Sequence, residues 1–337
     1  MNNNNITIAI DAMGGENSPF KTLKGSEIFL NNKNNVYLYI FGDENIIRET
    51  ISKNNIQLSN YSVINTDENI NDEDPISIII RSKKNSSIRK GLEFIKQKPF
   101  SGFVSSGNTG GIMTLSKLSL GMLEGIERPA ICSMIPNKKS FSIILDLGAN
   151  ISPSAKNLFQ FAFMGYCYHS IIKPNIEPKI SLLNIGTEDN KGKEYIQECA
   201  NLINSSFLKK YFIGYIEPDK IFSGESDIMI TDGFTGNMIL KTAEGLSNYI
   251  MKNLQNLFKK SILNKFAYKI IENDIKRLKD IINPEEYNGA MLLGVNGISI
   301  KSHGSANAYA FSQALENCYK FIKNDINSKI IHQLNKE

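Results

Sequence analysis

The sequence predicts an α/β protein, a three-layer α/β/α sandwich built around a mostly parallel sheet. Short runs rich in β-branched and aromatic residues recur along the chain, and longer stretches with helical periodicity lie between many of them. This alternation is typical of a parallel sheet with helices on both faces. No internal repeat or low-complexity linker interrupts the 337 residues, so we expect residues 1–337 to form a single α/β domain.

Each expected strand is a short apolar run that ends at a polar or glycine-rich segment. The strands are predicted over residues 6–10, 36–41, 61–64, 103–105, 131–135, 142–145, 180–185, 212–216, 228–231 and 298–300. The expected helices carry apolar residues at spacings of three and four. They are predicted over residues 110–120, 158–168, 192–203, 236–250 and 306–322.

The composition argues against several classes of protein. A net charge of +4 is too mild to indicate a nucleic-acid-binding surface. The four cysteines lie far apart without a C-x-x-C pair, so neither a metal site nor a disulfide is expected, and we interpret Cys167 and Cys199 as small apolar residues on helix faces. The N-terminus does not resemble a signal peptide, and no apolar run reaches about 18 residues, so no membrane-spanning segment is expected.

Six polar segments follow strand-like runs, and most of them are rich in glycine. Ligands of open α/β sheets bind beyond the carboxyl ends of the strands, so we expect the six segments to converge on one cleft. Each segment taken alone is also compatible with an ordinary turn. Their candidate residues are Asp11, Gly14 and Gly15; Gly107, Asn108, Thr109 and Gly110; Asp146 and Asn150; Gly186; Asp232 and Asn237; and Lys301, Ser302 and His303.

The second segment, SSGNTGG, is expected to open the helix at 110–120. Free N–H groups at a helix start, beside glycines that allow close approach, favour an anion. The segment is not a Walker A loop, because Asn108 stands where the P-loop lysine belongs, and it is not a G-x-G-x-x-G fingerprint. A plain helix N-cap is the alternative interpretation.

Further cations are candidates for the same cleft. Lys241 lies four residues after Asn237, so the two share a helix face, although a solvated lysine is an alternative. Arg128 precedes Pro129 and is expected in an extended or turn conformation, where it would clamp a phosphate or form a surface salt bridge. Lys301, Ser302 and His303 place a cation, a hydroxyl and an imidazole in succession, which suits a site that holds an anion and handles a transferred group. A polar turn is the alternative there.

Residues 246–282 are predicted to form a protruding basic amphipathic helical element. Between residues 246 and 280, eight Lys or Arg residues stand against three Asp or Glu residues, around apolar positions at helical spacing. This pattern favours contact with an anionic membrane or an acidic protein. A dimer-forming or core-packed helix pair is the alternative. The expected membrane-contact residues are Leu257, Phe258, Ile262, Leu263 and Phe266.

Together these motifs resemble the bacterial phosphate acyltransferases of phospholipid synthesis, the PlsX family. The matching strings run in order over nearly the whole chain. They are IAIDAMGGE, IIRSKKNSSI, SSGNTGGIM, GIERPAI, ILDLGAN, LLNIGTEDNKG, ITDGFTGNMILKTAEG and LLGVNGISIKSHGSANAYAF. Three departures from the family pattern are Glu16 and Asn85, where aspartate is usual, and Pro218, where glycine is common.

The resemblance implies an activity and partners. It implies a Rossmann-like catalytic domain that transfers a fatty acyl group from acyl carrier protein to inorganic phosphate, without a cofactor. It also implies a cytoplasmic homodimer that associates peripherally with the inner face of the cell membrane, where a membrane-bound glycerol-3-phosphate acyltransferase consumes the acyl phosphate.

The chemistry of the implied reaction suggests roles for the candidate residues. Phosphate is ionised at neutral pH and a thiolate leaves readily, so positioning and oxyanion stabilisation should dominate over covalent catalysis. We expect Asn108, Thr109 and Gly110 to cradle phosphate or the oxyanion, and Lys301 to supply charge. His303 would donate a hydrogen bond or a proton to the leaving sulfur. Asp146 and Asp232 would orient cations and helix starts, and we count Asp232 with the catalytic group.

Two other functions fit parts of the pattern. An NAD-dependent dehydrogenase of the isopropylmalate type has a related architecture, but the missing dinucleotide fingerprint argues against it. A membrane-surface scaffold that has lost catalysis is the second alternative, and the intact SSGNTGG, DGFTGN and KSHG segments argue against it.

Overall fold

The described part of the chain folds around one eleven-stranded sheet. The computed structural model describes residues 5–31, 33–282 and 287–336, without the side chains of residue 262 and residues 276–282. The strand order is β3-β2-β1-β4-β11-β10-β5-β6-β9-β7-β8. The strands are β1 (Ile6–Asp11), β2 (Val36–Gly42), β3 (Tyr61–Asn65), β4 (Ser101–Ser105), β5 (Ala130–Pro136), β6 (Phe141–Leu145), β7 (Ile180–Leu183), β8 (Phe212–Ile216), β9 (Ile228–Ile230), β10 (Ala290–Leu293) and β11 (Ile298–Lys301).

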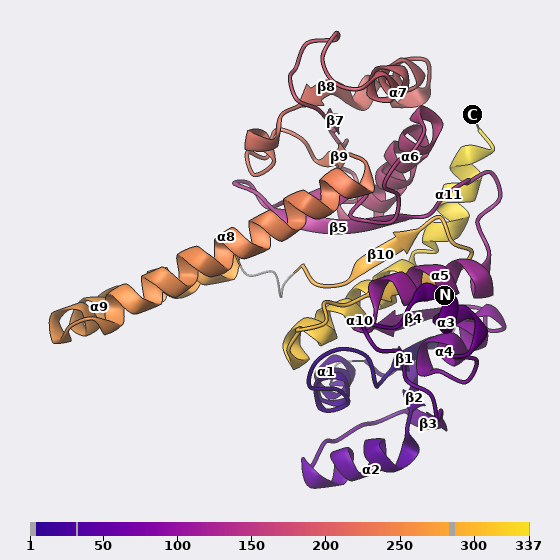
Figure 1. Ribbon diagram of the computed structural model, residues 1–337, viewed down its shortest axis with the longest axis vertical. Helices are drawn as coiled ribbons and strands as arrows, with labels where there is room; N and C mark the ends of the chain where they lie inside the picture. The colour runs from indigo at the N-terminus through magenta and orange to yellow at the C-terminus, as the bar shows by residue number, and fades with distance from the viewer. Residues whose placement is uncertain (1–4, 32, 283–286, 337) are drawn as a thin grey trace.

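Helices connect most of these strands (Figure 1). They are α1 (Phe20–Leu30), α2 (Glu44–Lys53), α3 (Ile76–Arg81), α4 (Ser87–Lys96), α5 (Thr109–Leu120), α6 (Ala155–Ile172), α7 (Glu194–Asn204), α8 (Gly233–Lys259), α9 (Ile262–Ile282), α10 (Ala308–Lys323) and α11 (Ile326–Leu334). Two short 3₁₀ helices, η1 (Phe207–Tyr211) and η2 (Pro218–Lys220), flank β8.

Alternate residues of the strands pack against helices on opposite faces of the sheet. Ile8 and Ile10 of β1 belong to one buried cluster, which also contains side chains of α1, α10 and α6. Ala9, which lies between them, belongs to a second cluster with side chains of α4 and α5. Because successive strand residues point to opposite faces, the two clusters are the two interfaces of a three-layer sandwich, as the sequence predicted.

The sheet is mostly parallel, but it consists of two parallel blocks that run in opposite directions. Strands β3, β2, β1, β4 and β11 run one way, and β6, β9, β7 and β8 run the other way. Because β10 is antiparallel to both β11 and β5, β5 again runs with the first block, and the reversal arises where β5 pairs antiparallel with β6. The carboxyl ends of the two blocks therefore lie at opposite edges of the sheet.

This reversal corrects the expectation that six loops meet at one edge. The loops after β1, β4 and β11 lie at one edge, which we call the first edge, and those after β6, β7 and β9 lie at the other, the second edge. The sequence did not reveal β10, whose run AMLL between Gly289 and Gly294 has no β-branched residue. The change of direction lies instead in the short connection between β5 and β6, residues 137–140, which is too short for a parallel crossover and therefore indicates an antiparallel pair.

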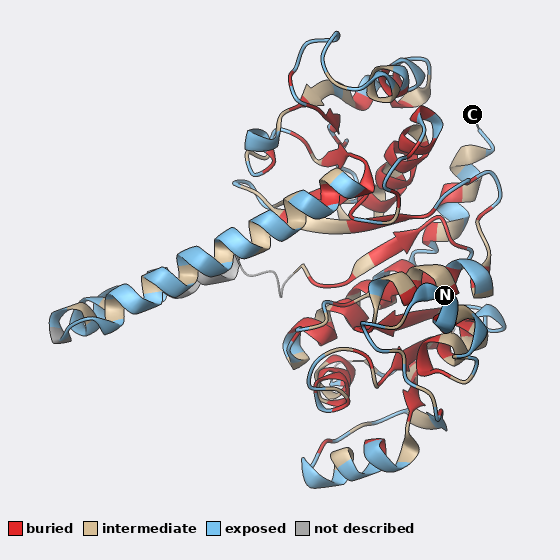
Figure 2. Cartoon of the chain, in the orientation of Figure 1, coloured by how far each residue is buried: buried red, intermediate tan, exposed pale blue. Residues whose placement is uncertain are grey.

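A single long helix, α8, connects the two edges. It starts directly after β9 and then projects from the sheet together with α9, against which it packs (Figure 1). The projecting part is largely exposed (Figure 2), and it includes apolar side chains such as Leu246, Tyr249 and Ile250. Within the described part of the chain, no helix is both long and apolar enough to cross a membrane.

The first turn of α8 is clamped against the loop after β6. Asp232 caps the helix by accepting hydrogen bonds from the backbone N–H and the hydroxyl of Thr235, both at 2.8 Å. The Gly233 N–H donates to the Asn150 carbonyl at 2.7 Å. A Cβ on Gly236 would lie 1.9 Å from the Asp146 carbonyl oxygen, so only glycine allows the helix to pack this closely.

We predict that Gly236→Ala destabilises the protein by about 1–3 kcal/mol, because the added methyl group must displace backbone. The matched control is Gly245→Ala in the same helix, where a Cβ meets nothing within 4 Å. That substitution should stabilise α8 by roughly 0.5–1 kcal/mol through helix propensity. Urea unfolding of both variants measures the difference, and equal effects would contradict the clamp.

Candidate active site

Asp11, the last residue of β1, organises the first edge. Its carboxylate is buried and accepts hydrogen bonds from the hydroxyls of Ser87 and Ser105, both at 2.6 Å, and from the Met13 N–H at 3.0 Å. Ser105 Oγ in turn accepts a bond from the Gly107 N–H at 2.9 Å. The predicted residue Asp11 therefore joins the loop after β1 to the loop after β4 and to the start of α4.

The two predicted glycines of the first loop allow close approach of backbone. A Cβ on Gly14 would lie 2.4 Å from an Asp11 carboxylate oxygen and 2.5 Å from the Gly107 nitrogen. Gly15 has a φ of +80°, and a Cβ there would lie 2.8 Å from the Gly304 carbonyl oxygen. These glycines bring the loops after β1, β4 and β11 into direct contact.

Asn108 lies where the sequence predicted it, at the start of α5, but its side chain has structural partners. Its Oδ1 accepts a hydrogen bond from the Gly111 N–H at 2.8 Å, which caps the helix. Its Nδ2 donates to the Asp72 carbonyl at 2.9 Å. The N–H groups of Thr109 and Gly110 have no acceptor within the helix, because they belong to its first turn. The anion-binding capacity of this segment thus resides in its backbone.

Lys301 ends β11 and faces the loop after β4. Its Nζ donates to the Ser302 carbonyl and lies 3.5 Å from the Ser106 carbonyl oxygen. Burial lowers the pKa of Lys301 to about 8, and the positive charge of Lys21 lowers it as well. A lysine held this way is still protonated at neutral pH, and it carries a weakly solvated charge.

Ser302 and His303 have different surroundings. Ser302 is buried, and its Oγ accepts a hydrogen bond from the Asn288 side chain at 2.8 Å, so it supports the loop. His303 is exposed. Its Nδ1 lies 2.9 Å from the Ser305 hydroxyl and 3.3 Å from the Ser305 nitrogen, and its Nε2 lies 3.7 Å from a carboxylate oxygen of Glu244.

Glu244 was not singled out from the sequence, yet it connects α8 to the first edge. It accepts a hydrogen bond from the predicted residue Lys241 at 2.8 Å and faces His303. His303 and Lys241 together lower the pKa of Glu244 to about 2, so its carboxylate is ionised at any physiological pH. The sequence signal that could have identified Glu244 is its position three residues after Lys241 in the same predicted helix, a spacing that lets the two side chains pair.

The carboxylates at the second edge have structural hydrogen-bond partners. Asp146 is fully buried and accepts five hydrogen bonds, from the N–H groups of Ile131, Gly148, Ala149 and Asn150 and from the Asn150 side chain. Burial raises the pKa of Asp146, and these donors oppose that rise. Besides capping α8, Asp232 accepts a hydrogen bond from the Tyr195 hydroxyl at 3.1 Å.

The remaining candidate residues lie away from the loops after β1, β4 and β11. Asn150 also donates to the Pro129 carbonyl at 2.7 Å, and the exposed Arg128 donates to the Ser152 carbonyl at 3.3 Å. A Cβ on Gly186 would meet only side chains of its own loop. Asn237 is exposed on α8 and lies beside Gly148.

The three departures from the family pattern are accommodated locally. The Glu16 side chain is exposed, and its backbone N–H donates to the Gly304 carbonyl at 2.9 Å. Asn85 donates its side-chain amide to the Asp67 carboxylate, a partner that an aspartate would repel. Pro218 opens η2, where the missing N–H is not needed.

The predicted membrane-contact residues differ in exposure. Leu257, Leu263 and Phe266 are exposed, whereas the ring of Phe258 packs on Tyr268 with 5.2 Å between ring centroids. The side chain of Ile262 lies outside the described part of the structure.

The cysteines offer no nucleophile near the first edge. All four are buried, and Cys167 and Cys199 lie within α6 and α7, as the sequence predicted. Burial raises the pKa of every one of them, to about 12 for Cys167, so the reactive thiolate form is scarce.

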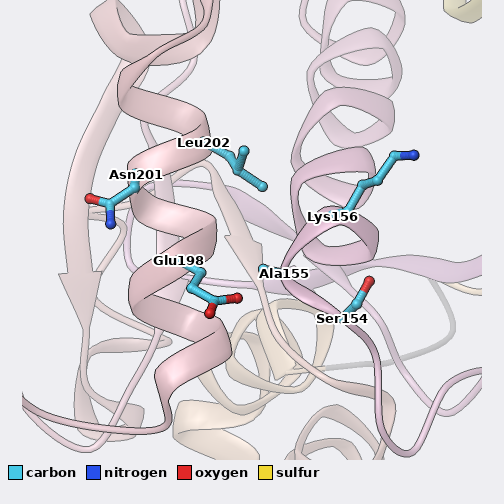
Figure 3. A pocket seen from close by; sticks show the side chains of 6 residues that line it. All are labelled: Ser154, Ala155, Lys156, Glu198, Asn201 and Leu202. Atoms are coloured by element: carbon cyan, nitrogen blue, oxygen red, sulfur yellow. The ribbon is translucent and has the colours of Figure 1, made fainter.

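A cavity of about 500 Å³ opens between the start of α6 and α7 (Figure 3). Another, of about 230 Å³, lies near the end of α6 and includes His169 and Tyr211 in its lining. None of the residues lining either cavity is one of the predicted site residues.

The comparisons with known proteins agree on one family. A family model described as "Fatty acid synthesis protein" matches residues 6–329. The phosphate acyltransferase of Ehrlichia canis is 40% identical over 334 residues, which cover 98% of this chain and 99% of that protein. The phosphate acyltransferase of Neorickettsia sennetsu is 37% identical over 333 residues, with 98% and 97% covered.

Solved structures share the fold at low sequence identity. A phosphotransacetylase from Streptococcus pyogenes superposes with a TM-score of 0.62 at 16% identity, over 95% of this chain and 94% of that one. A phosphotransacetylase from Staphylococcus aureus gives 0.60 at 15% identity, with 94% of both chains covered. The family model and the relatives span nearly the whole sequence, and the chain therefore belongs to the phosphate acyltransferase family of fatty acid synthesis proteins.

Proposed function

We propose that this protein transfers a fatty acyl group from acyl carrier protein to inorganic phosphate and releases acyl phosphate for phospholipid synthesis. The observation that carries the proposal is the cluster of Lys301, His303 and the first turn of α5 at the first edge. It combines an ammonium group, an imidazole and free backbone N–H groups, which suit the positioning of phosphate and the stabilisation of an oxyanion during attack on a thioester.

In the proposed reaction, an oxygen of phosphate attacks the thioester carbonyl carbon. The carbonyl oxygen becomes an oxyanion, which the N–H groups of Thr109 and Gly110 would stabilise, while Lys301 holds the phosphate. Collapse of the tetrahedral intermediate breaks the carbon–sulfur bond and leaves acyl phosphate and a thiolate. The thiolate receives a hydrogen bond or a proton from His303.

Glu244 is proposed to position His303 for that step. Ser305 can donate its N–H to Nδ1 of the neutral imidazole, whose proton is then on Nε2. The Glu244 carboxylate lies 3.7 Å from Nε2, beyond hydrogen-bond distance, so this N–H can donate a hydrogen bond to the leaving sulfur. Asp146, Asn150 and Asp232 would act indirectly, by fixing the start of α8 that carries Lys241 and Glu244. Arg128, Gly186 and Asn237 would contact a substrate, and Arg128 would do so as a clamp for phosphate.

We also propose that α8 and α9 form the surface for partners. Their exposed apolar residues alternate with lysines, a pattern that suits an anionic bilayer. A homodimer through the same helices and docking of the acidic carrier protein would use the same basic surface. Delivery of acyl phosphate to a membrane-bound glycerol-3-phosphate acyltransferase would follow from that location.

The activity itself is tested by incubating the purified protein with palmitoyl-acyl carrier protein and phosphate, and trapping acyl phosphate with hydroxylamine. We predict phosphate-dependent hydroxamate, and about 10²-fold or greater loss of turnover in Lys301→Ala and in His303→Ala. Circular dichroism checks their folding. Absence of product with several chain lengths would favour the inactive scaffold, and NAD binding would favour the dehydrogenase.

Membrane association is tested with the triple variant Lys259→Glu, Lys260→Glu and Lys265→Glu. At about 1 kcal/mol per basic residue near an anionic surface, binding to phosphatidylglycerol vesicles should weaken about 10²-fold or more. The matched control reverses three exposed lysines elsewhere, Lys96, Lys98 and Lys138. Equal binding by both variants would exclude α8 and α9 as the membrane surface.

A further inference from the structure

Lys21, in the first turns of α1, is an unusual lysine. Its side chain is only 2% exposed, and its Nζ donates to the Gly304 carbonyl in the loop after β11. Burying an ammonium group is costly unless it is paired with a negative charge. Among the described residues, no carboxylate lies within salt-bridge distance of Lys21 Nζ.

Lys301 is a second cation of this kind, and its ammonium group lies near that of Lys21. Lys301 Nζ is held by the carbonyls of Ser302 and Ser106 and, among the described residues, also has no carboxylate within salt-bridge distance. The two lysines repel each other, since the charge of Lys21 contributes to lowering the pKa of Lys301. Two like charges held together by backbone carbonyls form an arrangement that an anion would stabilise.

A buried hydroxyl without a partner lies in the same place. Ser106 Oγ has no hydrogen-bond partner among the described residues, although the residue is only 2% exposed. Lys21 Nζ, the Gly304 carbonyl oxygen and Ser106 Cβ all lie within 3 Å of the position that a Cβ on Gly15 would take, at 2.6, 2.8 and 2.9 Å. The missing Cβ of Gly15 is therefore what lets these groups converge.

We propose that Lys21, Lys301 and the Ser106 hydroxyl form the binding site for the phosphate dianion. The two ammonium groups would neutralise the dianion, and the orphaned hydroxyl would donate to one of its oxygens. This inference rests on the proposed function for the identity of the anion. It places the phosphate where the loops after β1, β4 and β11 meet. The N–H groups in the first turn of α5 then remain free to stabilise the oxyanion.

Negative groups around the lysines do not fill the site. Asp11 already accepts three hydrogen bonds, and Glu16 and Asp72 are exposed to solvent, which screens their charges. Asp11, Glu16 and Asp72 raise the pKa of Lys21, but burial outweighs them and lowers it to about 8. Lys241 adds a further positive charge near Lys301.

The pH dependence of phosphate binding follows from these values. Both lysines are charged below about pH 8 and lose their protons as the pH rises through that value. The KM for phosphate should therefore increase as the pH rises above about 8 in the wild-type protein. In Lys21→Met, that increase should be smaller and should begin at a higher pH, because only the Lys301 proton remains to be lost and the charge that helps to lower the pKa of Lys301 is gone.

The test compares Lys21→Met and Ser106→Ala with Lys24→Met, a lysine of the same helix that pairs with Glu27 at the surface. Loss of one charged hydrogen-bond donor should raise the KM for phosphate about tenfold or more in Lys21→Met, and loss of the hydroxyl should raise it about threefold or more in Ser106→Ala. The KM for acyl carrier protein should stay unchanged in both, and Lys24→Met should match the wild type.

The Ser106→Ala variant distinguishes an effect on phosphate binding from a folding defect. Removing an unpartnered buried hydroxyl should leave the stability of Ser106→Ala unchanged or higher, so a raised phosphate KM cannot be a folding defect. Unchanged phosphate KM values in the folded variants would overturn the proposal. Thermal stabilisation by inorganic phosphate, measured without the thioester, tests the site independently of turnover. Loss of that stabilisation in Lys21→Met supports the site even if the acyltransferase assay fails, and full retention refutes it.

Discussion

The reversal of strand direction between β5 and β6 determines where each part of the site lies. Because the two parallel blocks end at opposite edges, the loops after β6 and β9 cannot join those after β1, β4 and β11 directly. The long helix α8 connects them. Its first turn is fixed by Asp146 and Asp232 at the second edge, and Glu244 reaches His303 at the first edge. The position of the imidazole thus depends on packing at the far end of the helix.

The first edge itself is held together by glycines and one buried carboxylate. Asp11 ties the loops after β1 and β4, and Gly14 and Gly15 let backbone from three loops come into contact. This packing leaves lysine ammonium groups facing backbone carbonyls rather than carboxylates. A site built this way is electrostatically incomplete without an anion, which suits an enzyme whose nucleophile is already ionised and needs only to be positioned.

Much of this arrangement could be predicted from the sequence, and the rest could not for identifiable reasons. Each expected strand overlaps an observed one, since β-branched runs bounded by glycine mark buried strands well. The reversal had a signal in the sequence, because the connection between β5 and β6 is too short for a parallel crossover, but the expectation of one common edge did not use it. Lys21 escaped notice because lysine is normally exposed, and only tertiary packing buries it. The sequence suggested a catalytic role for Asn108, whereas in the structure its side chain caps α5.

In the proposed reaction, phosphate attacks the thioester directly and no acyl-enzyme forms. This is tested by measuring the release of free carrier-protein thiol when stoichiometric protein is mixed with palmitoyl-acyl carrier protein in the absence of phosphate. We expect no release until phosphate is added, because all four cysteines are buried with raised pKa values. A stoichiometric burst of thiol, with an acyl group retained on the protein by mass spectrometry, would contradict it.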